Sequence, residues 1–132
     1  MGAAANRRLV QAAFDKGLDA VFDLLRDDAR WTITGTSPFA GIYTSRRQLL
    51  DEVIARLNAW LARPIQPTVE SIVAEGDRVV VLWRGHAVAL DGEPYDNVYS
   101  WHMRLEGGSV VEVTAFFDAP TLRDLLDRVQ AP

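Results

Sequence analysis

The chain has 132 residues, 48% of them hydrophobic, which fits a single domain, residues 1–132, with an ordinary core. Its net charge is -4 and its basic residues are scattered, whereas a nucleic-acid partner requires clustered Lys and Arg. It has no cysteine, which excludes disulfides and thiolate chemistry, and no apolar run of membrane-spanning length, so we expect a cytoplasmic protein without metal or other cofactor.

The first part of the chain predicts two short helices followed by a strand. Alternation from Arg30 to Thr34 predicts the strand, with Trp31 and Ile33 on one side. Pro38, between two glycines, predicts the loop after it. The helices are predicted by apolar residues at helical spacing on both sides of Gly17: Leu9, Val10, Ala13, Phe14, Val21, Phe22 and Leu25.

A longer helix is predicted next. Ser45 and Gln48 have the spacing of a capping box, in which the serine accepts a backbone N–H and the glutamine reaches back. Pro64 is expected to end the helix. Its apolar stripe consists of Leu49, Leu50, Val53, Ile54, Leu57, Trp60 and Leu61.

Beyond Pro64 the apolar pattern becomes twofold and predicts strands at 68–75, 78–90, 94–106 and 109–117. The turns between them are so short that consecutive strands must be antiparallel. A closing helix follows, with Leu122, Leu125, Leu126 and Val129 on one face. Asp118 precedes this helix and is expected to cap it.

The two last strands each have one apolar face. Because side chains alternate along a strand, these faces can form one concave wall against the helices. The strand predicted at 78–90 is apolar on both faces, so alternation alone does not show which face points to the helices. We expect a homodimer, in which a second subunit covers part of the face that the helices leave open. The common wall consists of Tyr95, Asn97, Tyr99, Trp101, Met103, Val111, Val113, Ala115 and Phe117.

The segment 95–118, YDNVYSWHMRLEGGSVVEVTAFFD, resembles the C-terminal half of SnoaL-like and nuclear transport factor 2-like proteins. The order of the predicted elements extends this resemblance to nearly the whole chain. It implies an α+β fold, in which a cone-shaped curved antiparallel sheet wraps around N-terminal helices, with an internal pocket and a short C-terminal helix. Ketosteroid isomerases, limonene epoxide hydrolases and polyketide cyclases are the relatives in fold that it implies.

Those enzymes use a carboxylate inside the cone. For the cyclases and epoxide hydrolases the resemblance places it at Ala115 here, where a methyl group cannot transfer a proton. Trp101 stands where a cyclase-like histidine would be. Arg84 and His86 resemble the Arg-x-Asp of epoxide hydrolases, with histidine in place of the aspartate. Phe14 stands where the isomerases have a phenol on the first helix. The three known chemistries therefore lack essential groups.

Three hypotheses follow. The first is binding of a small hydrophobic molecule in the internal pocket. The second is an isomerase, hydratase or cyclase in which His86 acts as base and Tyr99 or Arg84 polarises the substrate. The third is a dimeric interaction module. The predicted ligand contacts are Phe14, Trp31, Ile33, Asn97, Tyr99, Trp101, Val113, Ala115 and Phe117.

Overall fold

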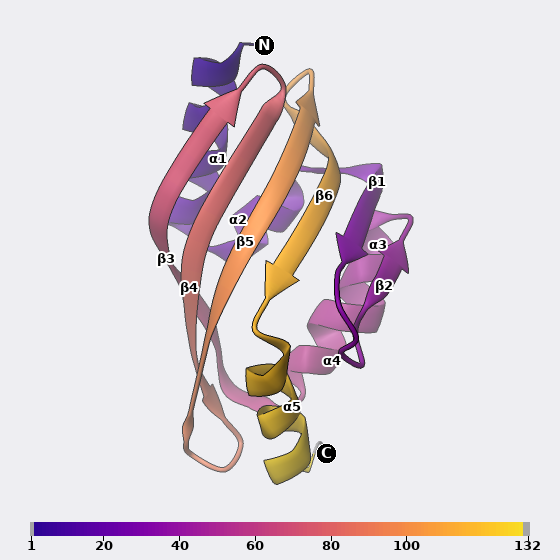
Figure 1. The fold of residues 1–132 in the computed structure, drawn as a ribbon, viewed down its shortest axis with the longest axis vertical. Helices are drawn as coiled ribbons and strands as arrows, with labels where there is room; N and C mark the ends of the chain where they lie inside the picture. Colours follow the sequence, from indigo (N-terminus) through magenta and orange to yellow (C-terminus); the bar gives the residue numbers. More distant parts are fainter. Residues whose placement is uncertain (1, 131–132) are drawn as a thin grey trace.

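The computed structural model describes residues 2–130 and has one six-stranded curved sheet with helices behind it (Figure 1). The strand order is β2-β1-β6-β5-β4-β3. Helix α1 lies behind β3, the segment α3 to α4 lies behind β1 and β2, and α5 lies at the end of β6. The predicted α+β class, with N-terminal helices and a short C-terminal helix, is confirmed.

The two N-terminal helices are α1 (Ala3–Lys16) and α2 (Leu18–Asp23), and they confirm the predicted pair. Gly17 separates them with a φ of 122°, a conformation that side chains other than glycine rarely adopt. Its N–H donates to the carbonyls of Ala13 and Phe14 at 3.1 and 3.2 Å, which closes α1. Leu25, predicted to continue α2, instead opens a strand.

That strand, β1 (Leu25–Ile33), is longer than predicted and pairs with two neighbours. It runs antiparallel to β2 (Gly41–Tyr43) and parallel to β6 (Ser109–Phe117). The parallel pairing corrects the expectation of a wholly antiparallel sheet. Thr34 secures it, because its N–H and hydroxyl both donate to the Ala115 carbonyl, at 3.1 and 3.0 Å.

The middle helical segment starts as predicted but ends early. It comprises α3 (Arg46–Leu49), a π-helical turn η1 (Leu50–Ile54) and α4 (Ala55–Asn58). The Ser45 hydroxyl accepts the Gln48 N–H at 3.0 Å, and the Gln48 side chain accepts the Thr44 N–H at 2.8 Å, so the cap is confirmed.

The predicted end of this helix at Pro64 was wrong. Three-residue turns tighten the chain after Asn58, with the Trp60 N–H donating to the Leu57 carbonyl at 3.0 Å. The Trp60 indole then donates to the Val129 carbonyl at 3.0 Å, which holds the segment against the C-terminal region. Leu61 therefore belongs to the next strand.

Three consecutive hairpins complete the sheet. They join β3 (Leu61–Glu75), β4 (Arg78–Ala89), β5 (Pro94–Glu106) and β6, and each pair is antiparallel as predicted.

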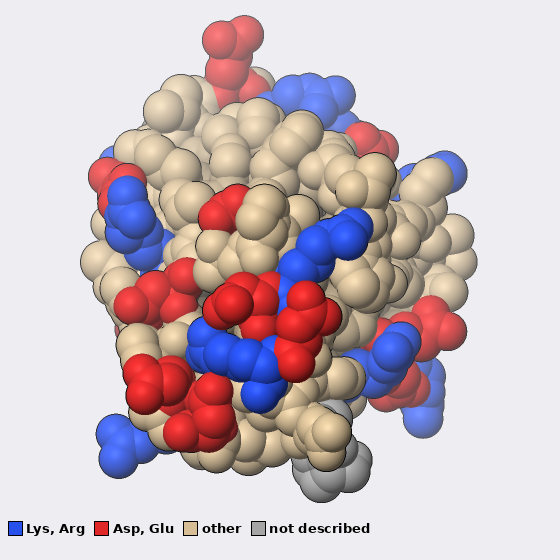
Figure 2. Space-filling model, turned by 60° about the horizontal axis from the view of Figure 1, so that its bottom comes forward, with Lys and Arg blue, Asp and Glu red and all other residues tan. Residues whose placement is uncertain are grey.

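The chain then forms α5 (Ala119–Arg128). Figure 2 shows the molecule from the end where α5 lies, with acidic and basic side chains interspersed. Arg128 pairs there with Asp91 and Asp124, which ties the helix to the β4–β5 turn.

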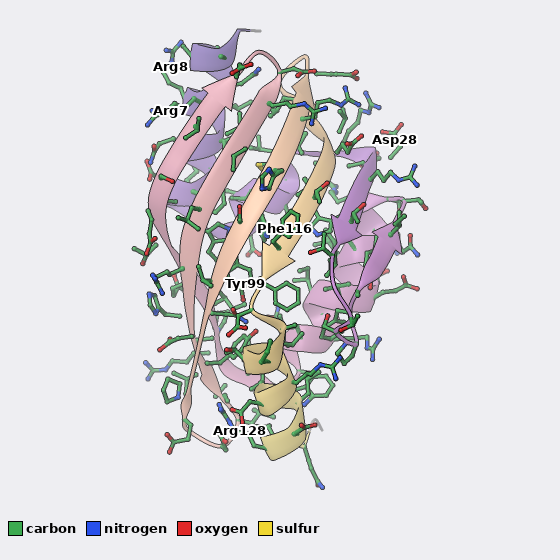
Figure 3. The ribbon with its side chains drawn as sticks, in the orientation of Figure 1. Arg7, Arg8, Asp28, Tyr99, Phe116 and Arg128 are labelled. Carbon is green, nitrogen blue, oxygen red and sulfur yellow. The ribbon has the colours of Figure 1, made fainter. Side chains whose placement is uncertain are left out.

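Side chains alternate cleanly between the two faces of β4 and β5. The inner face, toward the helices, takes Trp83 from β4 and Tyr99 and Trp101 from β5. The alternate residues of these strands point to the outer face, as does Phe116 of β6, which is labelled in Figure 3. This settles the orientation of β4, which its sequence left open, and places most of the core between the inner face and the helices.

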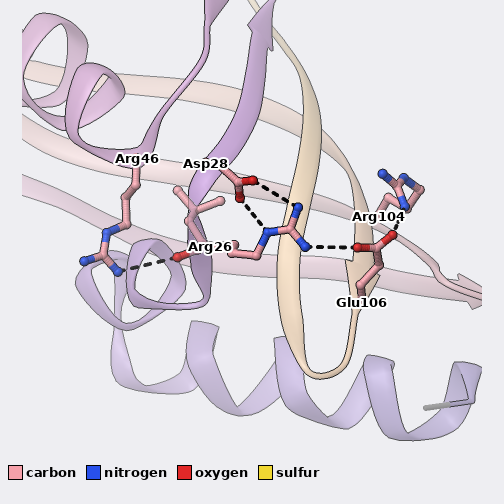
Figure 4. Close-up of polar contacts among 6 residues, drawn as sticks. Arg26, Asp28, Arg46, Arg104 and Glu106 are labelled. Carbon is pink, nitrogen blue, oxygen red and sulfur yellow. Dashed lines mark hydrogen bonds and ion pairs between the residues drawn. The ribbon is translucent and has the colours of Figure 1, made fainter.

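A surface network joins β1 to the β5–β6 hairpin and to α3 (Figure 4). Arg26 pairs with Asp28 and with Glu106, and Glu106 also pairs with Arg104. The hydrogen bond from Arg26 lowers the pKa of Asp28. Such exposed pairs contribute little to stability, so the network mainly fixes the position of the strand end. Within residues 2–130, no helix has the length and apolar character needed to span a bilayer.

Candidate functional site

A cavity of about 270 Å³ lies between the inner face of the sheet and the helices. The sheet provides its aromatic side, and α2, η1 and α4 close it from the helical side. Because these elements form the core, the cavity is part of the folded architecture and not a surface groove between loops. Its aromatic lining consists of Phe22, Trp31, Phe39, Trp83, Tyr95, Tyr99, Trp101 and Phe117.

The aromatic rings hold one another in fixed orientations. The Trp83 and Tyr99 rings are stacked, with centroids 4.1 Å apart and an interplanar angle of 12°. Trp101 meets Trp31 edge-on at 4.8 Å and Trp83 edge-on at 4.8 Å. Stacked and edge-to-face pairs are the favourable aromatic arrangements, so this wall is formed before any ligand arrives.

Two phenols provide polar atoms within the wall. Burial raises the pKa of Tyr99 well above its usual value, and burial likewise raises that of Tyr95. The Tyr95 hydroxyl accepts a hydrogen bond from the Asn97 amide at 2.9 Å. Both phenols are therefore neutral near physiological pH and can exchange hydrogen bonds with a ligand, but neither is a base.

Six of the predicted ligand contacts line this cavity: Trp31, Ile33, Tyr99, Trp101, Ala115 and Phe117. Phe14 does not, because it packs behind the wall, with its centroid 5.7 Å from that of Trp83 and 6.0 Å from that of Trp101. Val113 does not, because it is fully buried between its strand neighbours Trp31 and Met103. These two residues support the wall from the core.

Asn97 is buried but has a structural arrangement of its own. Its amide donates to the Tyr95 hydroxyl at 2.9 Å and to the Asp118 carbonyl at 3.1 Å. Its oxygen accepts the N–H groups of Val98 at 2.7 Å and Asp118 at 3.2 Å. With all these groups occupied, Asn97 fixes the corner between β6 and α5 and does not line the cavity.

Asp118 occupies the predicted N-cap position of α5 with extended backbone. Its carboxylate accepts a hydrogen bond from the Thr121 hydroxyl and makes no cap hydrogen bond to the backbone. Pro120, which lacks an N–H, occupies the first turn and leaves one donor fewer to satisfy. The position was thus predicted correctly, but the cap hydrogen bond was not.

Arg84 and His86 lie on the outer face, on the opposite side of the sheet from Tyr99. Arg84 pairs with Glu70, and the His86 Nδ1 lies 3.1 Å from an Asp96 oxygen. Both side chains line a second, smaller cavity of about 170 Å³ on that face. The predicted arrangement of His86 and Tyr99 around one ligand is therefore not found, because strand alternation directs them to opposite faces.

The helical side of the cavity was missed by sequence reasoning. Phe22 of α2, Val53 and Ile54 of η1 and Leu57 of α4 line it. Their apolar periodicity identified them as core, but only the packing of the helices against the sheet shows which core residues border the empty space. The break at Gly17, which also lines the cavity, was the one local signal for its opening.

Among the described lining residues, the charged ones are Lys16 and Asp19, and both are exposed. In the described part of the chain, no three His, Cys, Asp or Glu side chains come together as a metal ion would require. The inner cavity thus offers aromatic surface and neutral phenols, and Ala115 presents only a methyl group there.

Comparisons with known proteins agree with this architecture. The SnoaL-like domain family matches residues 6–113. An NTF2-like protein from Burkholderia thailandensis superposes with a TM-score of 0.77 at 18% identity, over 96% of this chain and 98% of that one. No curated protein matches the sequence.

Two further solved structures have names that refer to chemistry. A protein assigned as a SnoaL-like polyketide cyclase from Jannaschia sp. CCS1 has a TM-score of 0.75 at 21% identity, over 94% of this chain and 92% of that one. TerC, co-crystallised with polyporic acid, has a TM-score of 0.75 at 17% identity, over 92% of this chain and 98% of that one. At such identities the likeness shows the fold alone.

Proposed function

Since the chain belongs to the SnoaL-like domain family, we propose that it binds a small, largely hydrophobic molecule in the cavity of about 270 Å³. The observation that carries this proposal is the stacked and edge-on wall of Trp31, Trp83, Tyr99 and Trp101, which surrounds empty space. Apolar enclosure supplies affinity, and the Tyr99 hydroxyl supplies a hydrogen bond. The co-crystal of TerC with polyporic acid supports small-molecule binding by this fold.

Binding without turnover follows from Ala115. The resemblance to cyclases and epoxide hydrolases assigns the reactive carboxylate to this position, and its methyl group faces the cavity. General acid or base catalysis requires a group that exchanges a proton near neutral pH. Tyr99 remains protonated there and Ala115 has no proton to exchange, so we assign the cavity to ligand binding.

We expect the protein to bind the neutral fluorophore N-phenyl-1-naphthylamine, and Ala115→Leu to abolish that binding. The larger side chain would occupy the space beside Trp101, its partner across β5 and β6. Fluorescence titration measures affinity, and native mass spectrometry of the freshly purified protein detects any retained molecule. Leu90→Ala, at an exposed residue outside the cavity, is the control. Equal binding by both variants would place the probe elsewhere and refute the proposal.

We also propose that the protein forms a homodimer through the outer face of the sheet. Two apolar side chains are exposed on this face: Val73 on the edge strand β3, at 63%, and Phe116 on β6, at 45%. The strands between them contribute the half-buried Val80, Leu82 and Val98 to this face, together with the polar Ser100 and His102 of β5. An exposed apolar area on a sheet indicates a binding surface, since it gains by leaving water.

A second copy is the partner that the charges at the border of this face favour. Arg84 pairs with Glu70 at one end, and Arg104 lies 4.0 Å from Glu112 at the other. The border therefore has both signs at each end and does not require a partner of opposite net charge. A two-fold arrangement would place the apolar residues of one copy against those of the other, as a self-complementary interface requires.

Val73→Glu should convert the dimer into a monomer. The side chain is exposed, so folding should be unaffected, whereas a buried glutamate at the interface would lack a partner. Analytical ultracentrifugation measures the mass, with Leu90→Glu, at the β4–β5 turn, as the matched exposed control. A monomeric wild-type protein, or a Val73→Glu dimer, would contradict this interface.

A further inference from the structure

The polarity of the cavity changes from one end to the other. Its interior is bordered by buried aromatic rings and by the neutral phenols of Tyr95 and Tyr99. Its charged and amide side chains are all exposed: Lys16 and Asp19 at the α1–α2 junction, Asn58 at the end of α4 and Gln66 on β3. The polar side chains therefore mark the mouth of the cavity, and the aromatic ones mark its interior.

This gradient restricts how a ligand can enter. An ionised group moved into the interior would lose its hydration and meet no charge of opposite sign there, which is strongly unfavourable. The same group left at the mouth keeps part of its hydration. A ligand with an apolar body and one charged end is therefore held in a single orientation, with the charged end outward.

Lys16 is the group at the mouth that suits an anion. It is the only lysine of the chain, in which the other basic residues are arginines. It is the last residue of α1, directly before the turn at Gly17, and no hydrogen bond or ion pair within the described chain engages its ammonium group. A cation at a helix C-terminus is favourable in itself, but the side chain remains free to bind.

Asp19 lines the same mouth with the opposite charge. The two side chains are not paired with one another within ion-pair distance. An anion bound at Lys16 would be repelled by Asp19, so the mouth favours a single anionic group on the Lys16 side.

We propose that the cavity binds an amphipathic ligand whose apolar, ring-containing body lies inside and whose one oxyanion group, such as a carboxylate or sulfonate, is bound at the mouth by Lys16. This inference rests on the proposed ligand-binding function and adds the charge and orientation of the ligand. It assigns Lys16 a specificity role that no part of the aromatic wall can supply.

Two fluorescent probes test it. N-phenyl-1-naphthylamine and 8-anilinonaphthalene-1-sulfonate share one aromatic body, and only the second has a sulfonate. Lys16→Gln should weaken binding of the sulfonate probe about three- to fivefold, the upper part of the range for one exposed charge pair, and leave the neutral probe unchanged. Lys16→Arg should restore most of the affinity for the sulfonate, and Asp19→Asn should tighten its binding.

The single lysine allows a second measurement. Acetylation of Lys16 by an amine-reactive ester, quantified by mass spectrometry of the peptide that contains it, should slow when the sulfonate probe is bound and much less with the neutral probe. Equal weakening of both probes by Lys16→Gln would indicate a structural role and overturn the inference, as would unchanged sulfonate binding. If neither probe binds the wild-type protein, the proposed function itself fails. That result differs from both outcomes that overturn the role of Lys16 alone.

Discussion

Replacing Ala115 with aspartate should make the stability of the protein fall as the pH rises. Ala115 is 3% exposed and lies beside Trp101 on β5 and Ile33 on β1, so a carboxylate there would be desolvated. Desolvation raises the folded-state pKa above its unfolded value of about 3.9. The folded protein then holds the proton more tightly than the unfolded chain does. The loss of stability from ionisation is therefore absent below the unfolded pKa and grows as the pH rises toward the folded pKa.

A shift of about 3 units corresponds to about 4 kcal/mol of lost stability at neutral pH. Urea unfolding from pH 4 to 8 measures it. Ala115→Asn introduces a side chain of the same size without a charge to titrate, so the difference between the two variants isolates the ionisation. If that difference is flat across the pH range, position 115 is hydrated and the cavity is open to water.

Trp101→Ala should cost about 3–5 kcal/mol of unfolding free energy, a large part of the 5–15 kcal/mol typical of a domain. Trp101 is the centre of the aromatic wall, with ring contacts to Phe14, Phe22, Trp31 and Trp83. Its removal enlarges the cavity and leaves these rings without a common neighbour, and the loss is visible as a lower urea midpoint.

Trp60→Ala is the matched control for this loss. Trp60 is half-buried, does not line the cavity, and makes one indole hydrogen bond, to the Val129 carbonyl. Its removal should cost less than half as much. Equal losses would mean that the wall around Trp101 is no more tightly packed than the periphery. Should Trp101→Ala fail to fold, Trp101→Phe gives a smaller loss in the same direction.

Features encoded within one strand or one hairpin could be predicted from the sequence. The bounds of β5 and β6 and the inner face of β5 were correct, because strict alternation along a strand directly reflects which side is buried. The loop at Pro38 and the two short helices were likewise predicted from local signals. These local features were sufficient to identify most of the aromatic wall.

Features that depend on distant contacts could not be predicted. The parallel pairing of β1 with β6 has no local signature. Leu61 continues a helical stripe in sequence, yet it pairs with Ala89 in the sheet. Asn97 alternates in step with the aromatic residues of β5, but its side chain forms hydrogen bonds with the backbone of Asp118, where the chain turns. His86 was oriented only by the pairing of β4, since both faces of that strand are apolar.

The parallel contact between β1 and β6 also sets the order in which the chain can fold. Thr34 bonds to Ala115, 81 positions further along, whereas β3 to β6 join through adjacent hairpins. Closing so long a loop costs on the order of 4 kcal/mol of chain entropy, so the hairpins can assemble before the N-terminal third docks. Because Phe22, Trp31 and Ile33 arrive with that third, the ligand cavity is completed last. A bound ligand should therefore slow unfolding without accelerating folding.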